Sequence, residues 1–299
     1  MRNKLLLLSF IASLTLLFSC GEDSDSTPIQ SVDKDVVEKA DSTRANIFNI
    51  GGELFSIPSP IQTAFLIKKS GADFNKEILN SPKNTPNYST KFKKAVNLGI
   101  YGADLGYVTL YDNTQDALSY LNSVQQLSDE LGVTGAFNKE LIERFSENVG
   151  NQDSMLVLVS DAYRAGDSYL KDNKRHDVAA LILAGGWIES LYFSINIVEQ
   201  TNDASVIRRI GEQKTSLENL LNLLYTNYED QDIAALADQL ADLKDVYEGI
   251  EYTYVFEKPT IKAAKKRTVI NSKTEVKVTD EQLKEISKQV RSIRENLIS

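Results

Sequence analysis

Two long segments of this chain are apolar on every side, and they constrain its fold more than any other feature. Residues 95–111 carry one charge, Asp104, and residues 178–198 carry one, Glu189. A helix that is apolar all round is either buried at the centre of a protein or spans a membrane. The first segment has only 17 residues, whereas a span needs ~20, and each segment contains a carboxylate. We therefore predict two buried central helices.

Helical periodicity extends over most of the remaining chain. Apolar residues recur at spacings of three and four, which places them on one face of a helix. The connections between successive segments are short, as between antiparallel neighbours. We predict an all-α fold, an antiparallel helical bundle or helical-hairpin array, with helices over residues 60–70, 90–112, 114–131, 137–149, 153–171, 177–200, 204–228 and 231–250.

The pattern is different at the two ends of this helical region. Residues 30–50 are polar, and we expect them to be partly helical. After residue 250 two stretches alternate with a period of two, which is typical of β-strands, so we predict a small β-ribbon near 251–278. Thr279 and Gln282 then have the capping-box pattern that begins a final helix. We expect residues 251–299 to form an appendage of ribbon and helix.

Glycines lie on adjacent strips of both apolar segments. A glycine within a helix costs about 1 kcal/mol relative to alanine, so we expect the glycines to improve the packing in return. Our hypothesis is that the two central helices cross tightly through these strips. Alternatively, the glycines face a bulky aromatic side chain. The residues concerned are Gly99, Gly102, Gly106, Gly185 and Gly186, with Trp187 and Tyr101 as the aromatic candidates.

The N-terminus has the pattern of a lipoprotein export signal. Residues 1–19 contain two early cations and an apolar run that is short for a membrane span, and LFSC, ending at Cys20, resembles a lipobox. We predict a signal peptide over 1–19, acylation of Cys20, a flexible tether over 20–30 and a single mainly helical domain over 31–299. The alternative is an ordinary signal peptide with an incidental cysteine. The lipid bilayer, bound through the acylated Cys20, is thus an expected partner.

Charge and residue types exclude several function classes. Without residues 1–19 the chain has 31 Lys and Arg against 42 Asp and Glu, a net charge of −11, and this excess repels nucleic acid. Cys20 is the only cysteine and His176 the only histidine, which excludes Cys/His zinc sites and Cys–His nucleophile pairs. His176 lies in a polar stretch typical of a solvated loop. We expect no nucleic-acid partner, no metal, no cofactor and no catalytic residue.

The polar residues inside the apolar segments are candidate site residues. A buried charge must be paired or hydrogen-bonded, or its pKa shifts until it is neutral. Asp104 and Glu189 could therefore bond to hydroxyl or amide groups nearby and only fix the packing. Alternatively, they belong to a cleft that receives a small ligand or a cation. The candidate cleft residues are Asn97, Tyr101, Asp104, Tyr107, Trp187 and Glu189.

A run of cations interrupts this acidic chain. Five positive charges fall within ten residues, at Lys258, Lys262, Lys265, Lys266 and Arg267. Such a run is usually a solvated loop. Alternatively, it contacts an anionic partner such as lipopolysaccharide phosphates or an acidic protein.

Two strings, NLGIYGADLGY within residues 88–111 and GGWIESLY at residues 185–192, together resemble a family of uncharacterised Bacteroidetes lipoproteins. The likeness spans most of residues 50–250. Acidic residues directly after Cys20 also resemble the surface-export signal of such lipoproteins. The resemblance implies an outer-membrane location, on the periplasmic or the outer face, and carries no known activity.

These observations lead to two expectations for function. The first is a membrane-anchored, exported lipoprotein that acts as a non-enzymatic helical binding or interaction module of the cell envelope. Its ligand would be an envelope protein or a small solute. The second is an envelope hydrolase that uses Asp104 and Glu189 as paired carboxylates, the acid and base of glycoside hydrolysis.

Overall fold

The structure is a computed structural model that describes residues 47–50, 53–56, 66–136, 139–148, 174–262 and 267–299, with a few positions between 151 and 169. Helices make up 73% of the described residues, which confirms a mainly helical chain with a small antiparallel ribbon and a C-terminal helix. The predicted signal peptide, Cys20 and the tether lie outside the described residues. So do most of the helix predicted over 153–171 and the first half of that over 60–70.

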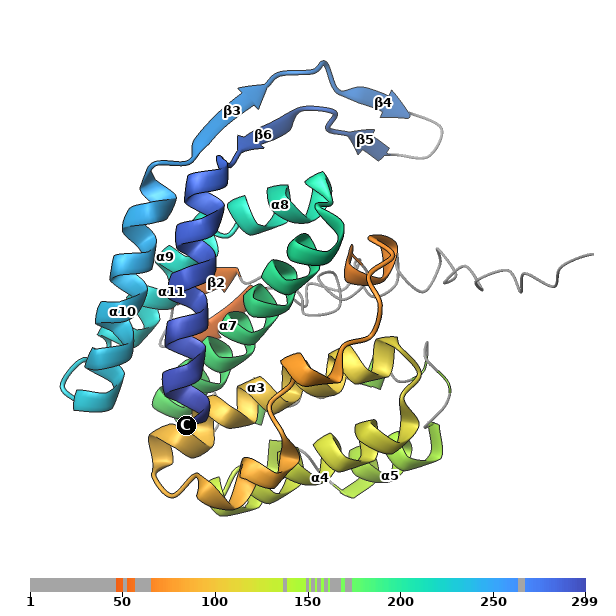
Figure 1. The fold of residues 1–299 in the computed structure, drawn as a ribbon, viewed down its shortest axis with the longest axis vertical. Helices are drawn as coiled ribbons and strands as arrows, with labels where there is room; N and C mark the ends of the chain where they lie inside the picture. The colour runs from red at the N-terminus through yellow and green to blue at the C-terminus, as the bar shows by residue number, and fades with distance from the viewer. Residues whose placement is uncertain are drawn as a thin grey trace, which may run out of the picture.

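Two buried helices, α3 (Lys91–Leu110) and α7 (His176–Thr201), form the centre of the protein, as predicted (Figure 1). Thr90 caps the start of α3 by accepting a hydrogen bond from the Lys93 amide. Among the described residues, α7 alone is long and apolar enough to cross a membrane, and 78% of its most apolar stretch is buried within the protein. The surrounding helices therefore cover α7 as a core helix.

Glycines bring these two helices into backbone contact. A Cβ added to Gly99 would overlap the carbonyl oxygen of Ile182, and one added to Gly185 would overlap that of Val96. The predicted tight crossing is confirmed, but Gly106 does not contribute to it, since an added Cβ there would meet nothing within 4 Å.

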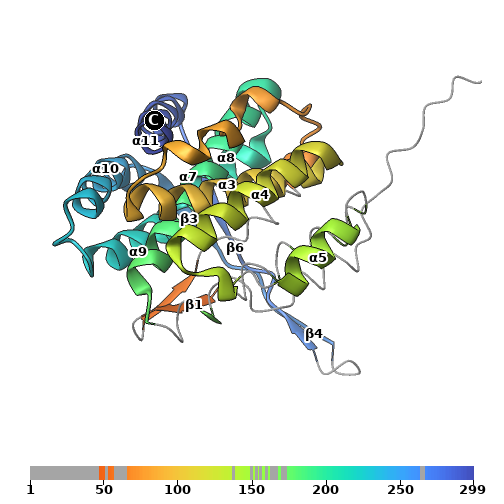
Figure 2. The same cartoon turned by 90° about the horizontal axis from the view of Figure 1, so that it is seen from below.

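The remaining helices surround this pair on several sides (Figures 1 and 2). Helix α4 packs on α3, whereas α8, α9 and α11 pack on α7, and α10 packs on both α9 and α11. Their bounds are α4 (Thr114–Leu131), α5 (Lys139–Asn148), α8 (Ala204–Gly211), α9 (Lys214–Tyr225), α10 (Gln231–Glu248) and α11 (Asp280–Ile298).

The single helix predicted over 204–228 is wrong, because the chain breaks after Gly211 into α8 and α9. Two tyrosine hydroxyls bind carbonyls at the end of α8: Tyr247 donates to Ile210 and Tyr252 donates to Gly211. These bonds satisfy carbonyl groups that would otherwise continue the helix. The missing side chain of Gly211 also leaves room for Val276 to pack against its backbone.

The predicted ribbon near 251–278 is present, and it contains two pairs of strands. Strand β3 (Glu251–Val255) pairs antiparallel with β6 (Lys273–Lys277), and β4 (Thr260–Lys262) pairs with β5 (Arg267–Val269) further out. We call residues 251–278 the ribbon arm. It arches over α8 and extends beyond it (Figure 1). Helix α11, which we expected to share an appendage with the ribbon, instead packs against α3, α7 and α10.

Of residues 30–50, which we expected to be partly helical, the structure describes only 47–50, and these form a strand. Strand β1 (Ile47–Ile50) pairs antiparallel with β2 (Glu53–Ser56). The intervening sequence is Gly51-Gly52, a dipeptide typical of two-residue hairpin loops, and the sequence prediction overlooked it.

Candidate functional site

The six candidate cleft residues all lie in the interior. They come from α3 and α7, and none is more than 4% exposed: Asn97, Tyr101, Asp104, Tyr107, Trp187 and Glu189. Their side chains fill the space between the central helices and their neighbours. The structure thus brings the predicted residues into one core region, but it does not place them at the protein surface.

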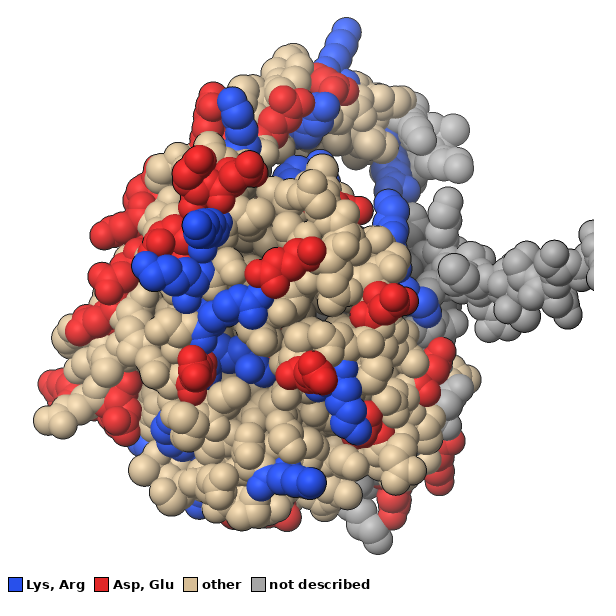
Figure 3. Space-filling view, in the orientation of Figure 1, with Lys and Arg blue, Asp and Glu red and all other residues tan. Residues whose placement is uncertain are grey.

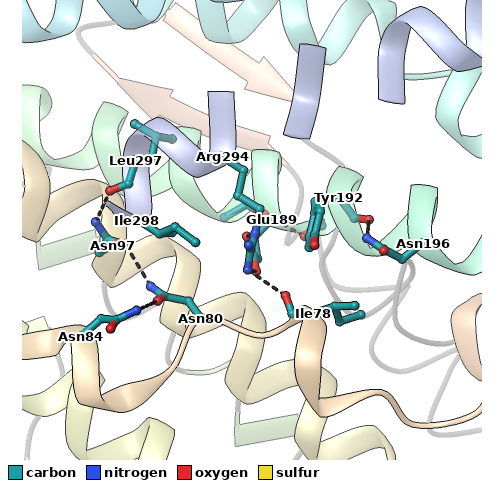
Figure 4. Close-up of polar contacts among 12 residues, drawn as sticks. Ile78, Asn80, Asn84, Asn97, Glu189, Tyr192, Asn196, Arg294, Leu297 and Ile298 are labelled. Carbon is teal, nitrogen blue, oxygen red and sulfur yellow. Dashed lines mark hydrogen bonds and ion pairs between the residues drawn. The ribbon is translucent and has the colours of Figure 1, made fainter. Parts of the chain in front are cut away.

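Glu189 has a partner that the sequence analysis missed. The guanidinium of Arg294, on α11, donates from Nε to Oε2 at 2.6 Å and from Nη2 to Oε1 at 2.7 Å (Figure 4). The same Nη2 donates to the Ile78 carbonyl at 2.8 Å, and the ring of Tyr192 lies 4.1 Å from the guanidinium carbon. Two parallel bonds to one carboxylate are the strong geometry of an Arg–carboxylate pair. Glu189 therefore stays ionised although it is fully buried.

Asp104 has a different environment. Neither carboxyl oxygen of Asp104 has a hydrogen-bond partner among the described residues. Burial raises the pKa of Asp104 well above its ordinary value, and the charge of Glu189 raises it further, while Arg294 acts in the opposite direction. Burial also raises the pKa of Glu189, but the Arg294 guanidinium opposes this. Burial and the neighbouring Glu189 charge thus favour the neutral form of Asp104, while the Arg294 guanidinium favours the ionised form of Glu189.

Replacing Asp104 with asparagine should remove a pH dependence from stability. Because the folded-state pKa of Asp104 is raised, the folded chain retains a proton that the unfolded chain releases above about pH 4. The stability that this proton supplies is complete below the unfolded pKa and is lost as pH rises through the folded pKa. Within that window the wild-type free energy of unfolding should fall by about 1.4 kcal/mol per pH unit from this group.

The Asp104→Asn variant has no such proton, because the amide side chain does not titrate. Urea denaturation of both proteins at several values from about pH 5 to 8 measures the difference. If the free energies of unfolding of the two proteins change equally with pH over this range, Asp104 is ionised in the folded protein.

A polar network extends from this cluster to the segment before α3. That segment contains two short 3₁₀ helices, η1 (Lys76–Ile78) and η2 (Pro82–Asn87). Between them, Asn80 donates to Asn97 at 3.1 Å, and Asn97 donates to the Leu297 carbonyl at 2.9 Å (Figure 4). The network therefore ties this segment to α3 and to the end of α11.

The other predicted site residues also have internal partners. Tyr101 donates to the Ser81 carbonyl, Tyr107 accepts from the Asn75 amide, and Trp187 donates to the Gln213 side chain. Buried polar groups that are satisfied in this way fix the packing of a core. This favours the first interpretation of Asp104 and Glu189, with the difference that an arginine, and not a hydroxyl or amide group, holds Glu189.

Two open surface features lie elsewhere on the molecule. A groove of about 570 Å³ lies beside the α9–α10 connection, with Lys91, Asp177 and Asp230 in its lining. Tyr225 and Tyr228, both exposed, also line it, with ring centroids 5.6 Å apart. Aromatic rings beside a few polar groups suit a small polar solute. No group of three or more His, Cys, Asp or Glu side chains that could hold a metal is found within the described part of the chain.

The ribbon arm is the second open feature. Four large apolar side chains on it are between 66% and 78% exposed: Tyr254, Phe256, Ile261 and Ile270. The alternating pattern predicts strands here, but it does not indicate that so much apolar surface faces solvent. The exposure arises because a two-stranded ribbon beyond α8 has no helix to cover its outer part (Figure 1).

Comparison with known proteins gives no relative: no family model, no curated protein and no solved structure matches this chain. The resemblance to Bacteroidetes lipoproteins therefore stays a prediction.

Proposed function

We propose that this chain is a membrane-anchored, non-enzymatic interaction module of the cell envelope, held at the outer membrane by acylation of Cys20. The observation that carries this proposal is the exposed apolar surface of the ribbon arm, at Tyr254, Phe256, Ile261 and Ile270. All four side chains lie on the ribbon arm, and large exposed apolar surface is typical of sites that contact a partner or a membrane. The ribbon arm extends this apolar surface beyond the helical body.

The burial of Asp104 and Glu189 weighs against the hydrolase alternative. Glycoside hydrolysis needs both carboxyl groups beside the glycosidic bond of the substrate. Both side chains are fully buried, and the two oxygens of Glu189 are taken by Arg294. The contacts of Asp104 and Glu189 are therefore those of residues that hold the core together. The geometry favours the interaction module over the hydrolase.

The anchoring step is tested by Cys20→Ser in the full chain with its signal sequence intact. We expect the wild-type protein to incorporate labelled palmitate and to stay with the envelope fraction after a high-salt wash. The variant should incorporate no palmitate and should leave the envelope in that wash, because salt weakens the remaining electrostatic contacts with a bilayer. Immunoblots of the washed fractions measure this. An unacylated variant that still resists the wash would overturn the proposed anchor.

A further inference from the structure

The ribbon arm differs in charge from the rest of the chain. Residues 251–278 contain seven Lys or Arg and three Glu, a net charge of +4, whereas all other residues together sum to −13. Figure 3 shows basic side chains at the outer end of the arm and acidic side chains gathered along α10. An anionic surface would therefore attract the arm and repel most of the body.

Two cations at the outer end are not neutralised within the described part of the protein. Lys258 and Arg267 have no carboxylate partner among the described residues. The register also pairs Lys262 with Arg267 along the backbone of β4 and β5. An anion bound beside Lys258 and Arg267 would pair with these two charges.

Apolar and basic residues are combined at this end of the arm. In the β4–β5 pair, Ile261 shares one face with Thr268, and Arg267 lies on the other face. A flat protein interface would favour apolar residues on one face only. The headgroup layer of a bilayer surrounds an inserted element, so it accepts apolar side chains and cations on different faces.

The base of the arm is held firmly against the body. The Tyr252 hydroxyl donates to the Gly211 carbonyl at 2.6 Å, and the Lys214 ammonium lies 5.8 Å from the centre of the Tyr252 ring. Val276 packs over Gly211 from the neighbouring strand. The outer part stands clear, with an opening between it and the body in Figure 3. The arm therefore points its cations and exposed apolar residues in a fixed direction.

We propose that the outer end of the ribbon arm binds the surface of an anionic phospholipid bilayer. Lys258 and Arg267 contact lipid phosphates, while Phe256, Ile261 and Ile270 enter the interfacial layer. This inference deepens the proposed function and rests on it, because the acyl anchor places the body beside a bilayer and the arm then sets its orientation.

The test uses the chain from residue 20 onward with Cys20→Ser, which lacks the acyl group and keeps every residue that the structure describes. Co-sedimentation is measured with vesicles of phosphatidylcholine alone and of phosphatidylcholine mixed with phosphatidylglycerol. We expect binding to the mixed vesicles only, weakened by added salt. In Lys258→Gln/Arg267→Gln the partition coefficient should fall about 25-fold, or about fivefold per charge. Phe256→Ser/Ile261→Ser should also lower it.

A matched control removes two exposed cations from the helical body, in Lys83→Gln/Lys284→Gln. The net charge changes equally, but neither residue is on the arm, so we expect almost unchanged binding. Circular dichroism should show the same melting temperature for all variants, since the changed residues are exposed.

Two results would overturn the proposal. One is an equal loss of binding in the arm and body variants, which would indicate a general charge effect. The other is no preference for the anionic vesicles. If the chain then binds immobilised polyglutamate, and the arm variant does not, the partner of the arm is an acidic protein. Neither result bears on the Cys20 anchor, because the assayed chain is not acylated.

Discussion

Replacing Arg294 with methionine should lower the free energy of unfolding by about 3–5 kcal/mol, the usual cost of leaving a buried charge without its partner. Glu189 would lose both charge-assisted bonds, and the Ile78 carbonyl would lose its donor. Methionine has a similar length and is flexible enough to fill most of the vacated space. Urea denaturation at neutral pH measures the change.

The double variant Glu189→Gln/Arg294→Met is the control for this prediction. It removes both charges, so no uncompensated ion remains in the core, and most of the lost stability should return. Lowering the pH should also restore part of the stability of Arg294→Met, because protonation then neutralises Glu189. If the double variant is no more stable than Arg294→Met, the loss comes from packing and not from an unpaired charge.

The second large effect is expected at the crossing of α3 and α7. Changing Gly99 to alanine places a methyl group where the Ile182 carbonyl now lies, and this atom belongs to the backbone of the other helix. The helices must separate, which should cost about 1–3 kcal/mol. The thermal midpoint and the urea midpoint should both fall.

Gly106→Ala in the same helix is the matched comparison. An added Cβ at Gly106 would meet nothing within 4 Å, so the higher helix propensity of alanine should raise stability by up to about 1 kcal/mol. Two substitutions of the same type should thus have opposite signs. Equal effects at the two positions would contradict a crossing made through Gly99.

The crossing shows what residue spacing can predict. Glycines in two apolar segments indicated close helix packing, and the structure has it. Spacing alone did not distinguish Gly99 from Gly106, because both lie in the same helix and both lack a side chain. The distinction depends on where α7 passes, which is set by packing among all the helices.

The cluster around Glu189 shows a similar division. An acidic residue inside an apolar helix implied a partner, but Arg294 is 105 residues away in the chain. One signal was available in the final helix. Arg294 lies four residues after Val290 and three before Leu297, which places it on the apolar face of α11. A cation on such a face needs a buried anion.

Along the chain, the sequence by itself determined the elements whose causes are local. The central helices, the strands of the ribbon and the capping box at Thr279 depend on residues a few positions apart. Their periodicity and capping bonds are local and do not depend on how the rest of the chain folds. Tertiary structure alone decided that Arg294 pairs with Glu189, that Gly99 of α3 packs against the backbone of α7, and that the ribbon arm extends without cover. The physical reason is that burial and ion pairing join residues distant in sequence, so their outcome depends on how the whole chain packs.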